Sequence, residues 1–135
     1  MKEKLEIPAL RENFAGVTDF VGKLLKENGC SIKLRLLMET IVEEIFVNIA
    51  SYAYPESPGS AVIEFSCEKD TAEITFTDHG VPFDPLDHDD PDIDLPIEER
   101  SIGGLGILMT KKMMDKVTYR HENGCNILTI QKIIE

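Results

Sequence analysis

Two polar residues interrupt a segment that otherwise predicts a packing helix. From Ile41 to Tyr52 apolar residues recur at steps of three and four, and neither glycine nor proline occurs, which is typical of a helix with one buried face. At about 100° per residue, Glu44 and Asn48 fall on the same stripe as Ile41. A carboxylate buried without a partner is costly. Either an N–H group or a lysine of the protein pairs with these polar side chains, or they bind a ligand. The helix alone leaves both explanations open.

A glycine-rich run precedes another predicted helix. It reads Arg100-Ser101-Ile102-Gly103-Gly104-Leu105-Gly106. A glycine-rich turn that leads into a helix presents unpaired N–H groups and the positive end of the helix dipole to an anion, and phosphate is the natural guest. A flexible hinge before a helix explains the run equally well. The run is not a P-loop, because no Gly-Lys-Ser/Thr ends it, and a loop rather than a strand precedes it, which argues against a dinucleotide fingerprint.

A third polar cluster, Asp78-His79-Gly80, directly follows a predicted strand. In such a cluster the carboxylate can accept a hydrogen bond from an amine while the glycine backbone approaches a flat ring, and adenine offers such an amine. An ordinary Asp-x-Gly turn explains these residues alone more simply. Asn48 offers a neutral oxygen to Mg²⁺, which takes one or two protein oxygens together with phosphates and waters. Glu44 is placed to accept a proton from a hydroxyl or from a water that attacks a γ-phosphate.

The spacing of apolar residues along the chain predicts the helices and strands that must position these residues. Helices are expected at about 11–28, 31–54 and 104–115. Gly29 ends the first helix and Ser31 is a plausible N-cap of the second. The second helix is expected to turn Glu39 and Glu43 towards solvent.

The remaining periodic segments alternate as strands do. Strands are expected at about 3–10 (ended by Pro8), 61–67, 71–77, 116–122 and 125–133. Asn123-Gly124 is a strong hairpin signal between the last two. The order of elements predicts an α+β fold, a two-layer sandwich with a mostly antiparallel sheet and the helices gathered on one face.

Composition restricts the class of protein. A chain of 135 residues is expected to form one domain, residues 1–135. The formal net charge of −11 argues against nucleic-acid partners and against an anionic membrane surface. Cys30, Cys67 and Cys125 form no C-x-x-C pair, which suits free thiols in a reducing compartment. The first residues lead into no apolar signal core. A cytoplasmic protein is expected.

The three clusters together resemble a known family. Glu44-x-x-x-Asn48, Asp78-x-Gly80 and Gly104-x-Gly106 stand in the order and spacing of the N, G1 and G2 boxes of the GHKL (Bergerat-fold) ATPases. Within that superfamily the chain resembles the anti-sigma-factor serine/threonine kinases, in its compact length and in the residues that follow the second and third clusters. The resemblance extends from about residue 5 to residue 132. It implies a sandwich of a mixed sheet with three helices on one face.

The resemblance also implies roles for individual residues. Glu44 would be the general base and Asn48 the Mg²⁺ ligand. Asp78 would bind the amine of adenine, and Gly80 would let the ring approach. Thr129, on the last strand, matches a family threonine near adenine, although a strand threonine needs no special explanation.

The remaining implied roles belong to a lid over the nucleotide, at about residues 84–103. Gly104 and Gly106 would give backbone N–H groups to the phosphates of ATP. Arg100 would reach the γ-phosphate or a partner, or would be a solvated lid residue. The acidic run within the lid lacks the glycine and the bidentate glutamate of an EF-hand, so a solvated surface is favoured over a calcium site. Tyr52 stands where relatives often have histidine, so no role is assigned to it.

The function implied is that of an ATP- and Mg²⁺-dependent serine/threonine protein kinase. Its substrate would be a small antagonist protein with a serine or threonine acceptor, and a sigma factor would be a further partner. A homodimer is a family expectation. The alternative is an ATP-binding module that sequesters a partner without phosphoryl transfer.

Overall fold

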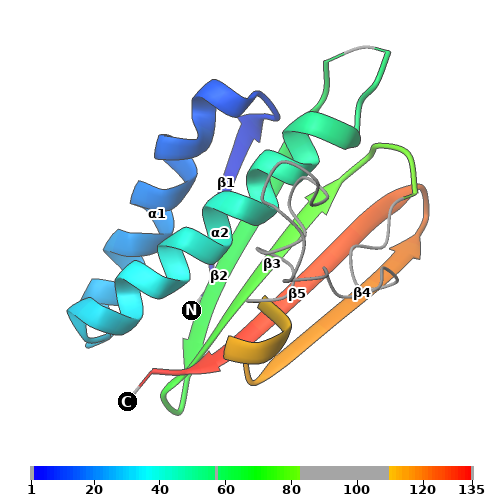
Figure 1. Ribbon diagram of the computed structural model, residues 1–135. Helices are drawn as coiled ribbons and strands as arrows, with labels where there is room; N and C mark the ends of the chain where they lie inside the picture. Colours follow the sequence, from blue (N-terminus) through cyan, green and yellow to red (C-terminus); the bar gives the residue numbers. More distant parts are fainter. Residues whose placement is uncertain (1, 57, 83–109, 135) are drawn as a thin grey trace, which may run out of the picture.

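The computed structural model describes residues 2–56, 58–82 and 110–134, and its elements form one sheet and one helix layer (Figure 1). The strands are β1 (Lys2–Pro8), β2 (Ser60–Glu68), β3 (Thr71–Asp78), β4 (Lys116–Glu122) and β5 (Cys125–Ile133). The helices are η1 (Arg11–Asn13), α1 (Phe14–Glu27) and α2 (Ile32–Tyr52). Residues 110–113 form one further helical turn. The rest of the third expected helix, 104–109, lies outside the described residues.

The sheet has the order β1-β2-β3-β5-β4, and all four described pairings are antiparallel. The mixed sheet implied by the family resemblance is therefore not found among the described strands. The physical reason lies in the connections. Two hairpins join β2 to β3 and β4 to β5. Between β1 and β2 the chain reverses direction three times, on entering α1, α2 and β2 in turn, so β2 runs antiparallel to β1. Asn123 and Gly124 have positive φ values of 55° and 78°, which confirms the hairpin expected there.

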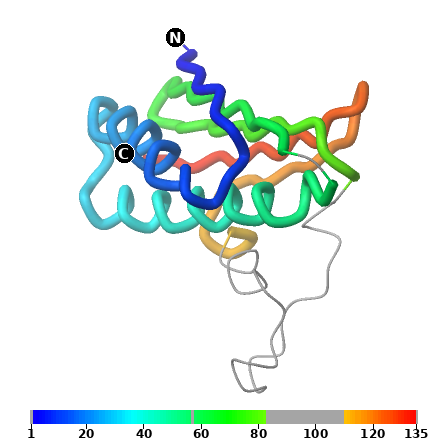
Figure 2. Tube along the Cα trace, turned by 90° about the horizontal axis from the view of Figure 1, so that it is seen from above, coloured from blue at the N-terminus to red at the C-terminus, as the bar shows by residue number. Residues whose placement is uncertain are grey.

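The core lies between the two layers. Figure 2 shows α1 and α2 on one face of the sheet, whose other face carries no helix within the described ranges. Along each inner strand apolar residues alternate with polar ones, as expected for a sheet covered on one face. The apolar side chains that point to the helices are those of Ile63, Phe65, Ile74, Phe76, Leu128 and Ile130, all buried.

Helix α2 is the long element that spans the sheet. Its start is fixed by the Ser31 hydroxyl, which accepts a hydrogen bond from the backbone N–H of Leu34 at 3.2 Å, so the expected N-cap is confirmed. Gly29, with φ of 83°, ends α1 as expected. At about 1.5 Å per residue, 21 residues carry α2 along most of a strand's length. One rigid rod therefore presents Glu44 and Asn48 near the end of the sheet where β3 terminates.

One expectation about this helix is wrong. Glu39 is not turned to solvent: its side chain is 26% exposed, and its Oε2 lies 3.5 Å from Nε of Arg35. A Cβ added to Gly22 of α1 would lie 3.0 Å from the Glu39 carboxyl carbon. The missing side chain at Gly22 thus lets α1 approach α2 closely enough to cover the carboxylate. None of the helices in the described ranges is long and apolar enough to cross a membrane.

Candidate functional site

A mostly apolar pocket opens between the C-terminal half of α2 and the ends of the central strands. Its lining residues are Ile45, Asn48, Ile49, Tyr52, Ala53, Phe76, Asp78, Tyr119, Asn126 and Leu128. The pocket thus brings together two predicted site residues, Asn48 and Asp78, that are thirty positions apart in the chain. An apolar pocket with a few convergent polar groups is the usual form of a site for a flat organic ligand.

Asp78 reaches this pocket because it takes the last inward-facing position of β3, after Ala72, Ile74 and Phe76. Its side chain is buried, with 4% of the residue exposed. Oδ1 accepts two hydrogen bonds, from the backbone N–H of Gly80 and from Nδ2 of Asn126, both at 2.9 Å. Within the described residues Oδ2 accepts none. Asp78 therefore has one satisfied oxygen and one acceptor left for a ligand donor.

Gly80 has a clear local requirement for glycine. A Cβ at this position would lie 2.2 Å from the carbonyl oxygen of Ala53, the residue that caps α2. The next N–H, that of Val81, donates to the same oxygen at 2.9 Å. Glycine here lets the chain after β3 dock on the end of α2, beside the pocket. This contact is independent of the approach of a ligand ring that the family resemblance implies.

Asn126 is the residue that the sequence analysis missed. It pairs with Asp78 across β3 and β5 and is 6% exposed. Its Nδ2 donates to Asp78 and also to the carbonyl oxygen of Val81 at 2.8 Å, while its Oδ1 accepts from the hydroxyl of Tyr119. The alternation of side chains along the strand could have revealed it. Asn126 lies on the same, inward-facing side of β5 as Leu128 and Ile130, where a polar residue is unexpected.

Asn48 and Glu44 follow each other along α2. Asn48 is 8% exposed, and its side-chain amide makes no hydrogen bond to any residue that the structure describes. Glu44 is half-buried, without a described ion pair. Burial raises the pKa of the Glu44 carboxyl above its ordinary value, and the charge of Glu43 raises it further. Glu44 therefore holds a proton more readily than an exposed carboxylate does.

The side-chain amide of Asn48 is suited to bind Mg²⁺. The amide lines the pocket without a hydrogen bond to the described residues, and an amide oxygen is a suitable ligand for this hard cation. Among the described residues no three His, Cys, Asp or Glu side chains gather as a metal cage. The described part of the protein would thus supply a single oxygen, with the remaining ligands coming from phosphates and waters.

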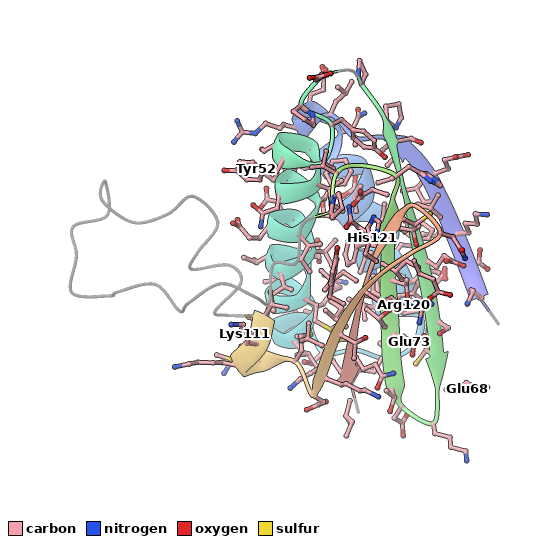
Figure 3. The ribbon with its side chains drawn as sticks, turned by 90° about the vertical axis from the view of Figure 1, so that its right-hand side faces the viewer. Tyr52, Glu68, Glu73, Lys111, Arg120 and His121 are labelled. Atoms are coloured by element: carbon pink, nitrogen blue, oxygen red, sulfur yellow. The ribbon has the colours of Figure 1, made fainter. Side chains whose placement is uncertain are left out.

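Thr129 is not brought to this pocket. It lies three positions after Asn126 and so points to the opposite face of the sheet, where its Oγ1 is 3.1 Å from Oγ1 of Thr75. That face, which carries no helix within the described ranges, is polar, with Glu73 and Arg120 among the residues that line it (Figure 3). The expected place of Thr129 near adenine is therefore not supported, and the residues that β5 contributes to the pocket are Asn126 and Leu128.

The remaining predicted site residues lie outside the described residues. These are Arg100, Gly104 and Gly106, together with the expected lid at 84–103. The chain is described again from Thr110, and the turn that contains Lys111 lies in the helix layer (Figures 1 and 3).

The sandwich, with its pocket between the central helix and the end of the sheet, is that of the histidine kinase-like ATPase domains. The chain belongs to this family, which matches residues 7–132. Solved structures agree on the fold. The RsbU and RsbW domains of Rv1364c from Mycobacterium tuberculosis superpose with a TM-score of 0.66 at 16% identity over 96% of this chain. The chain spans 32% of that longer protein. The Acinetobacter baumannii histidine kinase AdeS superposes with a TM-score of 0.54 at 12% identity, over 98% of this chain and 68% of its own.

Curated relatives are similar over almost the full chain. A protein named serine-protein kinase RsbW from Bacillus cereus (strain AH187) is 28% identical over 141 aligned residues, covering 98% of this chain and 85% of the relative. The protein of the same name from Bacillus mycoides (strain KBAB4) is 27% identical with the same coverage.

Proposed function

We propose that this chain is a serine/threonine protein kinase of the anti-sigma type, which uses ATP and Mg²⁺ to phosphorylate a small antagonist protein. The observation that carries the proposal is the meeting of Asn48 and Asp78 in one apolar pocket, with Glu44 one helical turn from Asn48. The relatives named serine-protein kinase RsbW support it. The proposal includes a single domain over 1–135, a cytoplasmic location, a sigma factor as second partner and a homodimeric state.

In the proposed complex the adenine ring occupies the pocket. Its exocyclic amine donates to Oδ2 of Asp78, while Phe76 and Leu128 give the ring apolar contact. Asn48 would hold Mg²⁺ through its amide oxygen, and the bound ion would neutralise charge on the phosphates. Gly104 and Gly106 would donate backbone N–H groups to the phosphates, and Arg100 would lie near the γ-phosphate.

Phosphoryl transfer then needs a base for the acceptor hydroxyl. The serine or threonine oxygen forms a bond to the γ-phosphorus as the bond to the leaving oxygen of ADP breaks, and the hydroxyl proton passes to the Glu44 carboxylate. The raised pKa of Glu44 brings the carboxyl closer to the pH of the reaction, which favours general-base catalysis. Most of the rate enhancement would come from positioning and charge neutralisation.

One observation favours the alternative, an ATP-binding module that sequesters a partner without transfer. Glu44 is not among the residues that line the pocket, whereas Asn48 and Asp78 are. A chain can therefore bind nucleotide through these two residues whether or not Glu44 reaches a substrate hydroxyl.

Replacement of the base separates the two functions. Glu44→Ala is expected to keep its affinity for ATP within about threefold and to lose transfer by about 10²-fold or more, because proton transfer contributes on this scale. The measurement is transfer of label from γ-labelled ATP to co-expressed small antagonist proteins, with ATP binding measured in parallel. Glu68→Gln, an exposed glutamate at the end of β2, is the matched control and should keep the transfer. Equal transfer by Glu44→Ala and the unmodified chain would show that Glu44 is not the base.

A further inference from the structure

We propose that Asn126, held by Tyr119, is a positioning residue that aims Asp78 at the 6-amino group of the purine and thereby sets the preference for adenine. This inference rests on the proposed binding of ATP. It concerns residues of β4 and β5 that belong to none of the three sequence clusters described above.

The hydrogen bonds of Asn126 use its whole amide. One N–H is directed to Oδ1 of Asp78 at 2.9 Å and the other to the carbonyl oxygen of Val81 at 2.8 Å. The Tyr119 hydroxyl donates to the amide oxygen. An amide turned by 180° would place its oxygen against two acceptors and its N–H groups against a donor. The orientation of Asn126 is therefore fixed by its surroundings.

The fixed amide in turn fixes the carboxylate. Oδ1 of Asp78 receives one donor from β5 and one from the backbone of Gly80. With these two bonds made, rotation of the carboxylate about its last bond would break both. Oδ2 is then the acceptor that remains for a ligand, at one defined place on the pocket wall. The backbone N–H of Gly80 alone would leave the carboxylate free to turn.

A single fixed acceptor discriminates between purines. A 6-amino purine donates to it, whereas a 6-oxo purine places a carbonyl oxygen against it, and unsubstituted purine offers no donor. Sites built to receive a particular hydrogen bond reject analogues that lack it, because the buried group is then unpaired. The recognition would thus depend on Asn126 through Asp78 and not on a direct contact of Asn126 with the ligand.

The test compares two ligands in each variant, ATP and purine riboside triphosphate, which lacks the 6-amino group. The readout is the ratio of their Kd values. A general loss of affinity cancels from this ratio, so a purely structural role of Asn126 would leave it unchanged. We expect a ratio of about tenfold or more in the unmodified chain, which corresponds to one charged hydrogen bond. Asp78→Ala should reduce the ratio to about one.

Asn126→Ala is expected to reduce the ratio to about threefold, and Asn126→Asp, which keeps the volume and the acceptor for Tyr119, should do the same. Tyr119→Phe should lower it by about twofold. Thr118→Ala, an exposed position on the same strand as Tyr119, is the matched control and should keep the full ratio. If circular dichroism shows that neither Asn126 variant folds, the ratio of Kd values in Tyr119→Phe tests the role of Asn126 instead.

The outcomes separate this inference from the proposed function. An unmodified chain that binds no ATP would refute both. In a second outcome, the unmodified chain binds ATP with the full ratio of Kd values. If the Asn126 variants then keep that ratio, only the role of Asn126 is refuted. Tyr119→Phe takes the place of the Asn126 variants where these do not fold. A ratio near one in the unmodified chain would show that Asp78 does not receive the amine, and the inference would again fail.

Discussion

Two buried asparagines differ in what surrounds their amides. Asn126 has a partner for both of its N–H groups and for its oxygen, whereas Asn48 makes no hydrogen bond to the described residues, although only 8% of it is exposed. A buried amide with all its partners contributes to the fold, whereas the amide of Asn48 faces the pocket, where a ligand can reach it. The contrast assigns different tasks to the same residue type.

Leucine substitutions at the two positions should therefore have opposite effects on stability. Asn48→Leu extends the apolar wall of the pocket and is expected to stabilise the protein by about 1 kcal/mol while weakening Mg²⁺-dependent ATP binding. Asn126→Leu leaves Val81 and Tyr119 without their partner and should destabilise it by about 2–4 kcal/mol. Urea unfolding without nucleotide measures both. A loss of stability in Asn48→Leu would mean that the amide is satisfied in solution.

Glu44 should also lower stability at neutral pH. The pKa of Glu44 is raised in the folded state, chiefly by burial. The protonated carboxyl therefore favours the folded state, and this contribution to the free energy of unfolding is complete below the pKa of about 4.3 that glutamate has in an unfolded chain. It is lost as pH rises through the higher pKa of the folded state. Glu44→Gln should consequently raise Tm at pH 7–8, on the order of 1–3 °C. The difference should vanish near pH 4.

Thermal unfolding across pH 4–8 tests this expectation. Glu68→Gln, at an exposed strand end, is the matched control and should show a much smaller pH-dependent difference. If the gain in Tm of Glu44→Gln instead grows towards low pH, the pKa of Glu44 is lowered rather than raised in the folded state.

At the scale of elements, the end of α2 is attached to the sheet at several points. The Tyr54 hydroxyl donates to the carbonyl oxygen of Ser60 at 2.7 Å and accepts from the N–H of His79 at 2.8 Å. Its ring lies where a side chain of Gly59 would be. Together with the contact between Gly80 and Ala53, these bonds connect the end of α2 to the start of β2 and the end of β3. The pocket walls are thereby joined at the rim.

Gly80→Ala should disturb this junction. The added methyl would meet backbone atoms at 2.2 Å, which cannot move as a flexible side chain does, so a loss of about 2–4 kcal/mol is expected together with weaker ATP binding. Gly124→Ala is the matched control. Its φ is positive at 78° but nothing lies within 4 Å, so it should cost only about 1–2 kcal/mol and leave binding unchanged. Equal stability losses with binding intact in both would argue against the contact with α2.

How far the sequence could predict these elements depended on the range of the signal. The cap at Ser31 and the turn at Asn123-Gly124 are set within a few residues, and both were predicted. The partnership of Asp78 with Asn126 depends on the register between strands far apart in the chain, which no local pattern specifies. Thr129 was expected at the site because it matches a family threonine near adenine, whereas its position in the alternation of β5 turns it to the other face of the sheet.

The same limit applies to helix packing. Glu39 was expected in solvent because its helical phase departs from the apolar stripe. The structure places it against α1, where Gly22 leaves room for a carboxylate. A glycine on one helix and a glutamate on the next carry no signal that they will meet. Asn48, in contrast, was predictable as a residue of a ligand site, because it interrupts an apolar stripe together with Glu44, which does not line the pocket.

At the scale of the whole molecule, charge opposes the proposed ligand. The chain carries a formal net charge of −11, and Mg²⁺-bound ATP is also an anion. Salt screens such repulsion, with a Debye length that falls from about 30 Å at 0.01 M to about 10 Å at 0.1 M. The association rate of Mg²⁺-ATP is therefore expected to rise about two- to fivefold over this range.

Stopped-flow measurements with a fluorescent ATP analogue at fixed Mg²⁺ would follow this rate. The same fluorophore on adenosine, which lacks the phosphates, is the control and should associate at a rate nearly independent of salt. A rate for the triphosphate that falls with salt would reveal a local positive field at the site that outweighs the net charge.

The two-faced sheet has a consequence for changes in chain length. Side chains alternate along β5, so Asn126, Leu128 and Ile130 share one face only while their spacing is kept. A single residue inserted after Gly124 would turn these three outward or force a bulge that moves Asn126 away from Asp78. Two inserted residues would restore the alternation. Natural variation in this hairpin should accordingly favour insertions and deletions of even length, a pattern that substitution tolerance alone would never reveal.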